Sequence, residues 1–174
     1  MGAVKRISGD YTIQSINSGN VVINAGNVSI SSLTAVQSAT AFGLKTVCQA
    51  GTTMINSGAP SAVQPIYVSS GQVQYFTGNS TVNWVPNFKF SVSQPLNSTM
   101  NIGDTVNMQI NTTNGSIAYF SNTAQVDGSS CTVRWNGGTS PSSGVINGVD
   151  VYSYTIIKTG NAAWSIFGSA LNYK

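Results

Sequence analysis

Four aspartates are the only acidic side chains in this chain of 174 residues, which contains no His and no Glu. They are Asp10, Asp104, Asp127 and Asp150. A glycosidase needs two carboxyl groups that face one another across the scissile bond, and nothing in the sequence indicates such a pair. Each aspartate stands in a turn-like setting, where its side chain commonly accepts hydrogen bonds from nearby backbone N–H groups. We therefore expect structural aspartates.

The sequence also offers few of the residues that other kinds of catalytic site or a metal centre would need. Serines are numerous, but there is no histidine base and no G-x-S-x-G turn to activate one. Cys48 and Cys131 are far apart and form no Cys-x-x-Cys pair, which favours two buried free thiols over a zinc site, with a disulfide left open. A calcium site of Asp, Asn and backbone oxygens also stays open, although no D-x-D-x-D-G loop is present. We expect no enzyme activity, no metal and no cofactor.

Charge is scarce throughout the chain. Charged residues make up 6 % of it, against roughly 25 % in a typical globular protein. The net charge is +3, but the seven basic residues are scattered and form no stripe that could follow a phosphate backbone. No apolar run is long enough to span a membrane, and no secretory signal follows Met1. We expect an ordered protein made in a cytosol as a complete chain, without nucleic-acid or membrane partners.

The aromatic residues offer one candidate binding surface. Trp135 and the neighbouring Asn136, with Tyr152 from a later strand, could contact a glycan or a protein partner. Core packing is the competing use of the tryptophans, because Trp135 and Trp164 both lie inside apolar strands. The loop at 136–148 is the expected contact region.

The elements that would position these residues are strands. Residues 105–113 alternate between apolar and polar types, with Val106, Met108 and Ile110 on one face. Residues 151–158 form the strongest predicted strand. Hairpin turns are predicted at Ser69–Gly71, Asn114-Gly115, Asp127-Gly128 and Gly160-Asn161. Regular spacing of strands and turns predicts an all-β fold, an antiparallel and jelly-roll-like β-sandwich.

A seven-residue phrase occurs twice near the start of the chain, at 17–23 and 24–30. Each copy provides an Asn/Gly turn and one three-residue strand, which cannot bury its own apolar side chains. Three chains around one axis could bury them as a β-prism. We expect trimerisation through four apolar residues: Val21, Ile23, Val28 and Ile30. The alternative is a pair of ordinary edge strands on the main domain.

A change in composition near residue 80 predicts the domain organisation. Large side chains and long strands concentrate after it. We expect a β stem at 1–35 for docking and trimerisation, a connector with short strands at 36–79, and a β-sandwich head at 80–174. Lys5 and Arg6 are the expected docking residues.

Several stretches of the chain resemble virion structural proteins of tailed bacteriophages, of the tail-fibre-like type found in marine phages. In the C-terminal half they are FSVSQPLNSTMNIGDTVNMQINTTNGS at 90–116, VDG at 126–128, VRWNGGTSPSSG at 133–144 and DVYSYTIIKTGNAAWSIFGS at 150–169. RISGDYTI at 6–13 and VVINAGNVSI at 21–30 resemble the opening of phage fibre proteins. The likeness covers about three quarters of the chain, and residues 36–80 add little to it.

The resemblance implies a virion protein without catalytic activity. It implies a short tail fibre or tail-associated appendage, assembled as a homotrimer and bound to tail, baseplate or capsid proteins. Larger relatives carry long insertions that this chain lacks, which favours a short appendage. The alternatives are a capsid decoration or head-fibre protein and a receptor-binding module for host surface polysaccharide.

Overall fold

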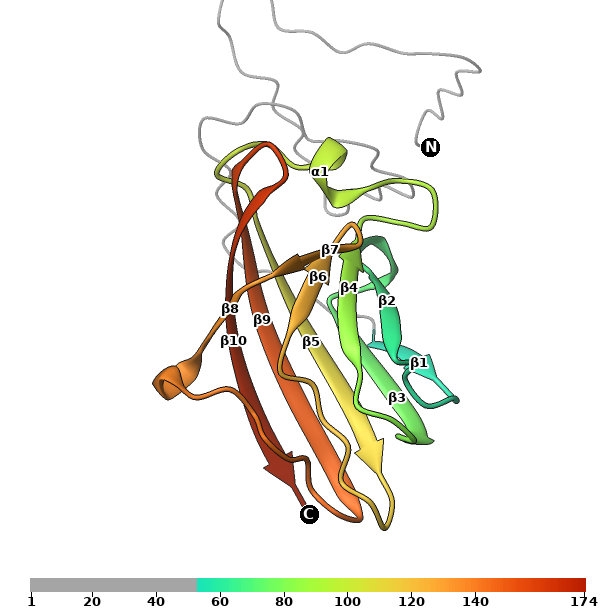
Figure 1. The fold of residues 1–174 in the computed structure, drawn as a ribbon. Helices are drawn as coiled ribbons and strands as arrows, with labels where there is room; N and C mark the ends of the chain where they lie inside the picture. Colours follow the sequence, from blue (N-terminus) through green and yellow to red (C-terminus); the bar gives the residue numbers. More distant parts are fainter. Residues whose placement is uncertain (1–52) are drawn as a thin grey trace, which may run out of the picture. The chain divides into compact units, whose positions relative to one another are not determined.

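The computed structural model describes residues 53–174, which form two packed β-sheets and three single helical turns (Figure 1). The first sheet has six strands, in the spatial order β1 (Thr53–Asn56), β3 (Val73–Asn79), β5 (Thr105–Asn114), β9 (Gly148–Gly160), β10 (Ala163–Tyr173) and β8 (Val133–Trp135). The second has four, in the order β2 (Val63–Tyr67), β4 (Val85–Lys89), β6 (Ala124–Val126) and β7 (Ser129–Cys131). The helical turns are η1 (Val68–Ser70), α1 (Leu96–Thr99) and η2 (Asn136–Gly138). The predicted all-β class is confirmed.

The chain winds back and forth between the two sheets. Strands β1 to β6 alternate between them, and each new strand lies parallel to the strand two places earlier. Only β6–β7, β5–β9 and β9–β10 pair antiparallel, whereas β8 joins β10 in parallel. Five of the eight pairings within residues 53–174 are therefore parallel. The predicted antiparallel, jelly-roll-like order is wrong for these five.

Two predicted hairpins are wrong because their strands lie apart. Ser69–Gly71 connects β2 to β3, which belong to different sheets. The segment after Asn114-Gly115 forms no strand, and β5 pairs instead with β3 and β9. Turn residues report a change of direction, whereas the partner of a strand is decided by where the chain can bury its apolar face.

Other local predictions are confirmed. The Asp127-Gly128 turn joins β6 to β7, with φ values of 51° and 85° that such a tight turn requires. The Gly160-Asn161 turn joins β9 to β10. Met108 and Ile110 of β5 are buried on one face of the strand, and Val106 is partly buried beside them.

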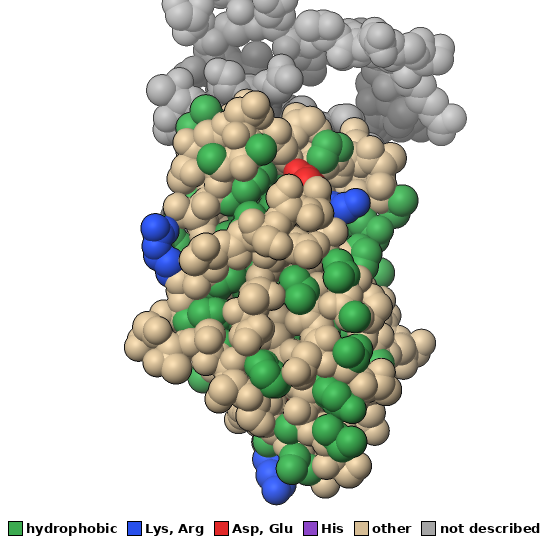
Figure 2. All heavy atoms as spheres, in the orientation of Figure 1, with side chains coloured by type: hydrophobic (Ala, Val, Ile, Leu, Met, Phe, Trp, Pro, Cys, Tyr) green, Lys and Arg blue, Asp and Glu red, His purple; other side chains and the backbone are tan. Residues whose placement is uncertain are grey.

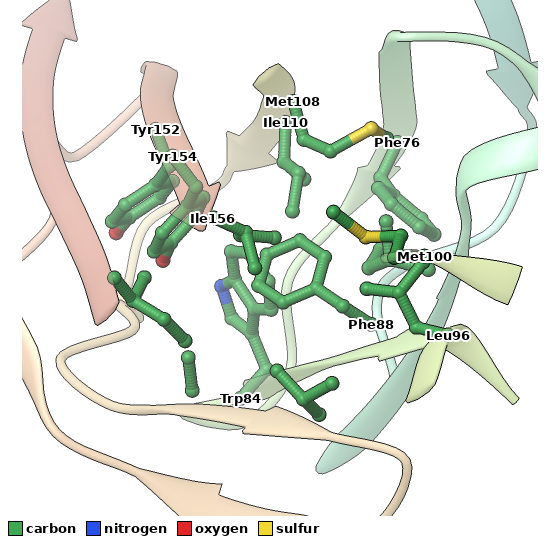
Figure 3. Packing of buried hydrophobic residues seen from close by; sticks show 14 residues of the cluster. Phe76, Trp84, Phe88, Leu96, Met100, Met108, Ile110, Tyr152, Tyr154 and Ile156 are labelled. Carbon is green, nitrogen blue, oxygen red and sulfur yellow. The ribbon is translucent and has the colours of Figure 1, made fainter. Parts of the chain in front are cut away.

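The hydrophobic core lies between the sheets and takes side chains from both (Figure 3). Tyr152, Tyr154 and Ile156 of β9 face Phe88 of β4, whose ring meets that of Tyr154 edge-on at 5.2 Å between centroids. Trp84, just before β4, is 1 % exposed and meets Tyr152 in the same way. These four rings are the largest of the fully buried side chains among the described residues.

The core also includes residues before position 80. Ile66 of β2 and Phe76 of β3 are 0 % and 3 % exposed, and β3 lies between β1 and β5 in the larger sheet. The expected boundary at 80 therefore falls inside one pair of sheets.

Strand β4 continues through Pro86. Its neighbour β6 pairs only with Asn87 and Phe88 and therefore needs no N–H from the proline.

Several predictions concern residues outside the described range. They are the stem at 1–35, its apolar residues Val21, Ile23, Val28 and Ile30, the docking residues Lys5 and Arg6, Asp10, and Cys48. Within 53–174, no helix is both long and apolar enough to cross a membrane.

Candidate functional site

The three described aspartates serve as hydrogen-bond acceptors within the fold. Asp127 accepts the backbone N–H groups of Leu96 at 2.7 Å and Asn97 at 2.8 Å, at the start of α1. Asp104 accepts the N–H of Asn101 at 2.7 Å. Asp104 thus has the predicted local role, whereas the partners of Asp127 lie about thirty residues earlier in the chain.

Asp150 departs from its predicted turn setting, because it lies inside β9 and is 1 % exposed. Its carboxylate accepts the backbone N–H of Val145 at 3.0 Å and the side-chain amide of Asn114 at 2.9 Å. Burial raises the pKa of this carboxyl group, and the two hydrogen bonds oppose part of the rise. The three carboxylates hold separate parts of the fold, and no cluster of potential metal ligands forms among residues 53–174.

Lys158 holds the opposite end of α1 from Asp127. Its ammonium group donates to the carbonyl oxygens of Asn97 and Met100, and it lies 5.9 Å from the ring centre of Trp164. The side chain is 7 % exposed. An anion at the first N–H groups and a cation at the last carbonyls both match the dipole of the helical turn. These charges stabilise α1 between the β6–β7 and β9–β10 turns.

Two predicted contact residues lie mainly in the core. Tyr152 is 1 % exposed, and its hydroxyl accepts the N–H of Ser121 at 3.1 Å, so it cannot contact a glycan or a partner. Burial raises the pKa values of Tyr152 and Tyr154 above that of an ordinary tyrosine. Trp135 is partly buried: its ring packs on Tyr154 at 5.9 Å, and its indole N–H donates to the carbonyl of Asn122 at 3.2 Å.

Gly168 of β10 makes room for the ring of Trp135. A Cβ atom at this position would lie 2.9 Å from two ring atoms and 2.7 Å from a methyl group of Val133. Trp135 thus packs against the core at the end of the sheet and, being partly buried, also lines the surface hollows described below. Asn136, by contrast, is exposed at the start of η2. Cys131 is a partly buried free thiol whose pKa is raised mainly by desolvation.

The outer face of the six-stranded sheet carries two adjoining hollows. One, of about 510 Å³, lies over β8, β9 and β10, and the other, of about 250 Å³, lies over the start of β3, β5 and β9. Ser153 and Thr155 line both. We call the combined feature the transverse trough. Its outward-facing side chains come from five strands: Val73, Asn107, Gln109, Ser153, Thr155, Phe167, Ser169 and Arg134.

The strand register places these side chains in two rows that cross the sheet. In the first row, Val73 pairs with Gln109, Gln109 with Ser153, and Ser153 with Ser169. The second row contains Asn107, Thr155, Phe167 and Arg134 in that order. Side chains directly opposite on neighbouring strands lie close enough to act on one ligand.

The predicted loop at 136–148 lies next to this feature. Trp135, Asn136 and Gly137 line the larger hollow. Trp135, Asn136 and residues 139–143 line a further hollow of about 260 Å³ against residues 169–172. The remaining trough residues were not predicted as a site. Their polar, outward positions could be read from the alternation in 105–113 and 151–158, but their adjacency depends on the order of the strands.

No protein-family model matches the chain, and no curated protein or solved structure matches it either.

Proposed function

We propose that this chain is a structural protein of a bacteriophage virion, a short tail-fibre or tail-associated appendage that assembles as a homotrimer. A non-catalytic role is supported by the hydrogen bonds that the described charged groups make within the fold. All three described aspartates and Lys158 are engaged in hydrogen bonds that hold turns and α1 in place. A catalytic acid or base has to be free to exchange a proton with a substrate.

The resemblance to phage virion proteins supports the assignment to a particle. The stretches 90–116, 126–128, 133–144 and 150–169 include β5, the β6–β7 turn, β8, most of β9 and much of β10. These elements form the C-terminal part of the two sheets and the anchors of α1. The resemblance thus covers the C-terminal strands and both anchors of α1, but not β1 to β4.

Trimer formation is tested on the full-length chain by sedimentation equilibrium. We expect three times the chain mass of 18.1 kDa. Replacing Val21 and Ile23 together by Ser should yield monomers, because the apolar contacts of the stem would be lost. The matched control replaces Val92 and Ile102, which are 79 % and 70 % exposed, and should remain trimeric. A monomeric parent protein at micromolar concentration would refute the trimer.

The station on the particle is tested by immunogold electron microscopy. Antibodies against the full-length chain would be applied to particles of the phage that encodes it. Gold at the tail supports the appendage, and gold spread over the head identifies a capsid decoration or head-fibre protein instead. Particles without gold, together with absence of the chain from their mass spectrum, would refute a virion role.

A further inference from the structure

We propose that the transverse trough binds a neutral, hydroxyl-rich oligosaccharide in an extended conformation. The proposal goes beyond a structural role in a virion and does not depend on it. It rests on the chemistry, the order and the dimensions of the outward-facing side chains.

The lining of the trough is polar but almost uncharged. Asn107 and Gln109 offer amides, and Ser153, Thr155 and Ser169 offer hydroxyl groups. Arg134, at one end, is the only charged side chain among the lining residues. Amides and hydroxyls can both donate and accept hydrogen bonds, as sugar hydroxyls do. A neutral ligand of this kind can therefore satisfy the lining without bringing an unpaired charge to it.

Phe167 adds an apolar platform to this polar surface. Its side chain is 45 % exposed on the outer face of β10, and the guanidinium carbon of Arg134 lies 5.9 Å from its ring centre. The face of an aromatic ring can cover the apolar C–H side of a sugar ring while the hydroxyl groups point to neighbouring amides. Phe167 pairs directly with Thr155, so both groups can contact one sugar unit.

Hydrogen bonds between the lining side chains fix their orientation. Thr155 donates to the side-chain carbonyl of Asn107 at 2.8 Å, which leaves the two amide hydrogens of Asn107 for a ligand. Gln109 donates to Asn111 at 3.0 Å, which leaves the side-chain carbonyl of Gln109 as an acceptor. Groups that are already oriented lose less conformational entropy when a ligand binds.

The dimensions favour a chain of sugars over a single one. Neighbouring strands are about 4.8 Å apart, so the trough from β3 to β8 is about 19 Å long. Because the hollows share Ser153 and Thr155, one extended ligand can occupy both. A second copy of this protein is a less suitable occupant, since the cores of homodimer interfaces are mainly apolar. Figure 2 shows that charged side chains are few on the face of the molecule that it presents.

Affinity electrophoresis of the full-length protein tests the proposal. Native gels would contain dextran, laminarin or mannan as neutral probes and alginate as a charged probe. We expect retardation in at least one neutral gel and none in alginate. Phe167→Ala should weaken the apparent affinity about tenfold or more, and Asn107→Ala severalfold. Ile102→Ala, which removes a 70 % exposed side chain outside the trough, should behave like the parent protein.

Three results would overturn the proposal: no retardation in any neutral gel, equal retardation of the parent and both trough variants, or retardation by alginate alone. A dimer that Phe167→Ala abolishes, without retardation by any probe, would assign the face to a second copy and also overturn it. Circular dichroism checks that each variant is folded. If Phe167→Ala is unfolded, the exposed Asn107→Ala substitution decides.

Discussion

At the scale of the residue, the notable feature is how the fold accommodates two buried charges. Asp150 and Lys158 lie eight positions apart on the inner face of β9, and neither bonds to an ion of opposite sign among residues 53–174. Asp150 takes its hydrogen bonds from a backbone N–H and an amide, and Lys158 donates to backbone carbonyls. Both charges are thus stabilised by the dipoles of backbone and amide groups. The stability of each charge therefore depends on the segments of the chain that hold those groups in place.

The raised pKa of Asp150 predicts a specific dependence of stability on pH. Between the ordinary value of 3.8 and the raised value, the folded protein holds the proton of Asp150 more tightly than the unfolded chain. The contribution of this group to stability is therefore complete at acidic pH and is lost as the pH rises through the folded pKa. We expect the unfolding free energy of the parent protein, minus that of Asp150→Asn, to fall between pH 3.5 and pH 7.

Urea denaturation of both proteins in the same buffers measures this difference. The variant cannot ionise at position 150, so the subtraction removes the effect of the other titrating groups. A difference that grows with pH would mean that the two hydrogen bonds to the carboxylate outweigh its desolvation.

At the scale of the element, the attachment of β8 to β10 depends on a residue without a side chain. Val133 and Trp135 of β8 occupy the space above Gly168, and Trp135 continues from there to Tyr154 in the core. This strand of three residues pairs with β10 in parallel, and it also packs the side chains of Val133 and Trp135 closely on the backbone at Gly168. It also places Arg134 and Asn136 at the end of the transverse trough.

Gly168→Ala should displace β8 from the sheet. The added methyl group would lie within 3 Å of Val133 and Trp135, and we expect a loss of about 2 kcal/mol in unfolding free energy. Gly58→Ala is the matched control, because no atom lies within 4 Å of a Cβ atom there. It should change stability by less than about 0.5 kcal/mol. Equal unfolding midpoints in urea for both variants would contradict this account.

The strands themselves were predicted better than the pairing between them. The alternation of residues 105–113 indicated which face of β5 would be buried, because side chains alternate along any strand. The pairing of β5 with β3 could not be predicted, since it depends on β4 crossing to the other sheet. The site could not be predicted for the same reason. Phe167 and Asn107 are sixty residues apart, and only the positions of β9 and β10 bring them into one row.

At the scale of the whole molecule, low charge has a consequence for its stability in salt. The described charged groups that hold the fold together bond to backbone or amide groups rather than to one another. Salt screens exposed ion pairs strongly, and partly buried interactions much less.

We expect stability to be nearly independent of salt. Between 20 mM and 500 mM NaCl, the unfolding free energy should change by less than about 1 kcal/mol, the upper range for one exposed ion pair. Chemical denaturation in urea, which carries no charge, measures it. A larger loss would show that networks of exposed charges contribute to the fold.

The winding of β1 to β6 also determines how this architecture can grow during evolution. Strands β1 and β2 lie at the same side of their respective sheets (Figure 1), and each has one neighbour among the described strands. Duplication of one complete circuit would add one strand to each sheet, with the same parallel hydrogen bonding as its neighbours. The C-terminal hairpin, α1 and its two anchors would be unaffected. The number of strands can therefore vary at the edge that β1 and β2 form, while the residues and contacts of the C-terminal hairpin and α1 are preserved.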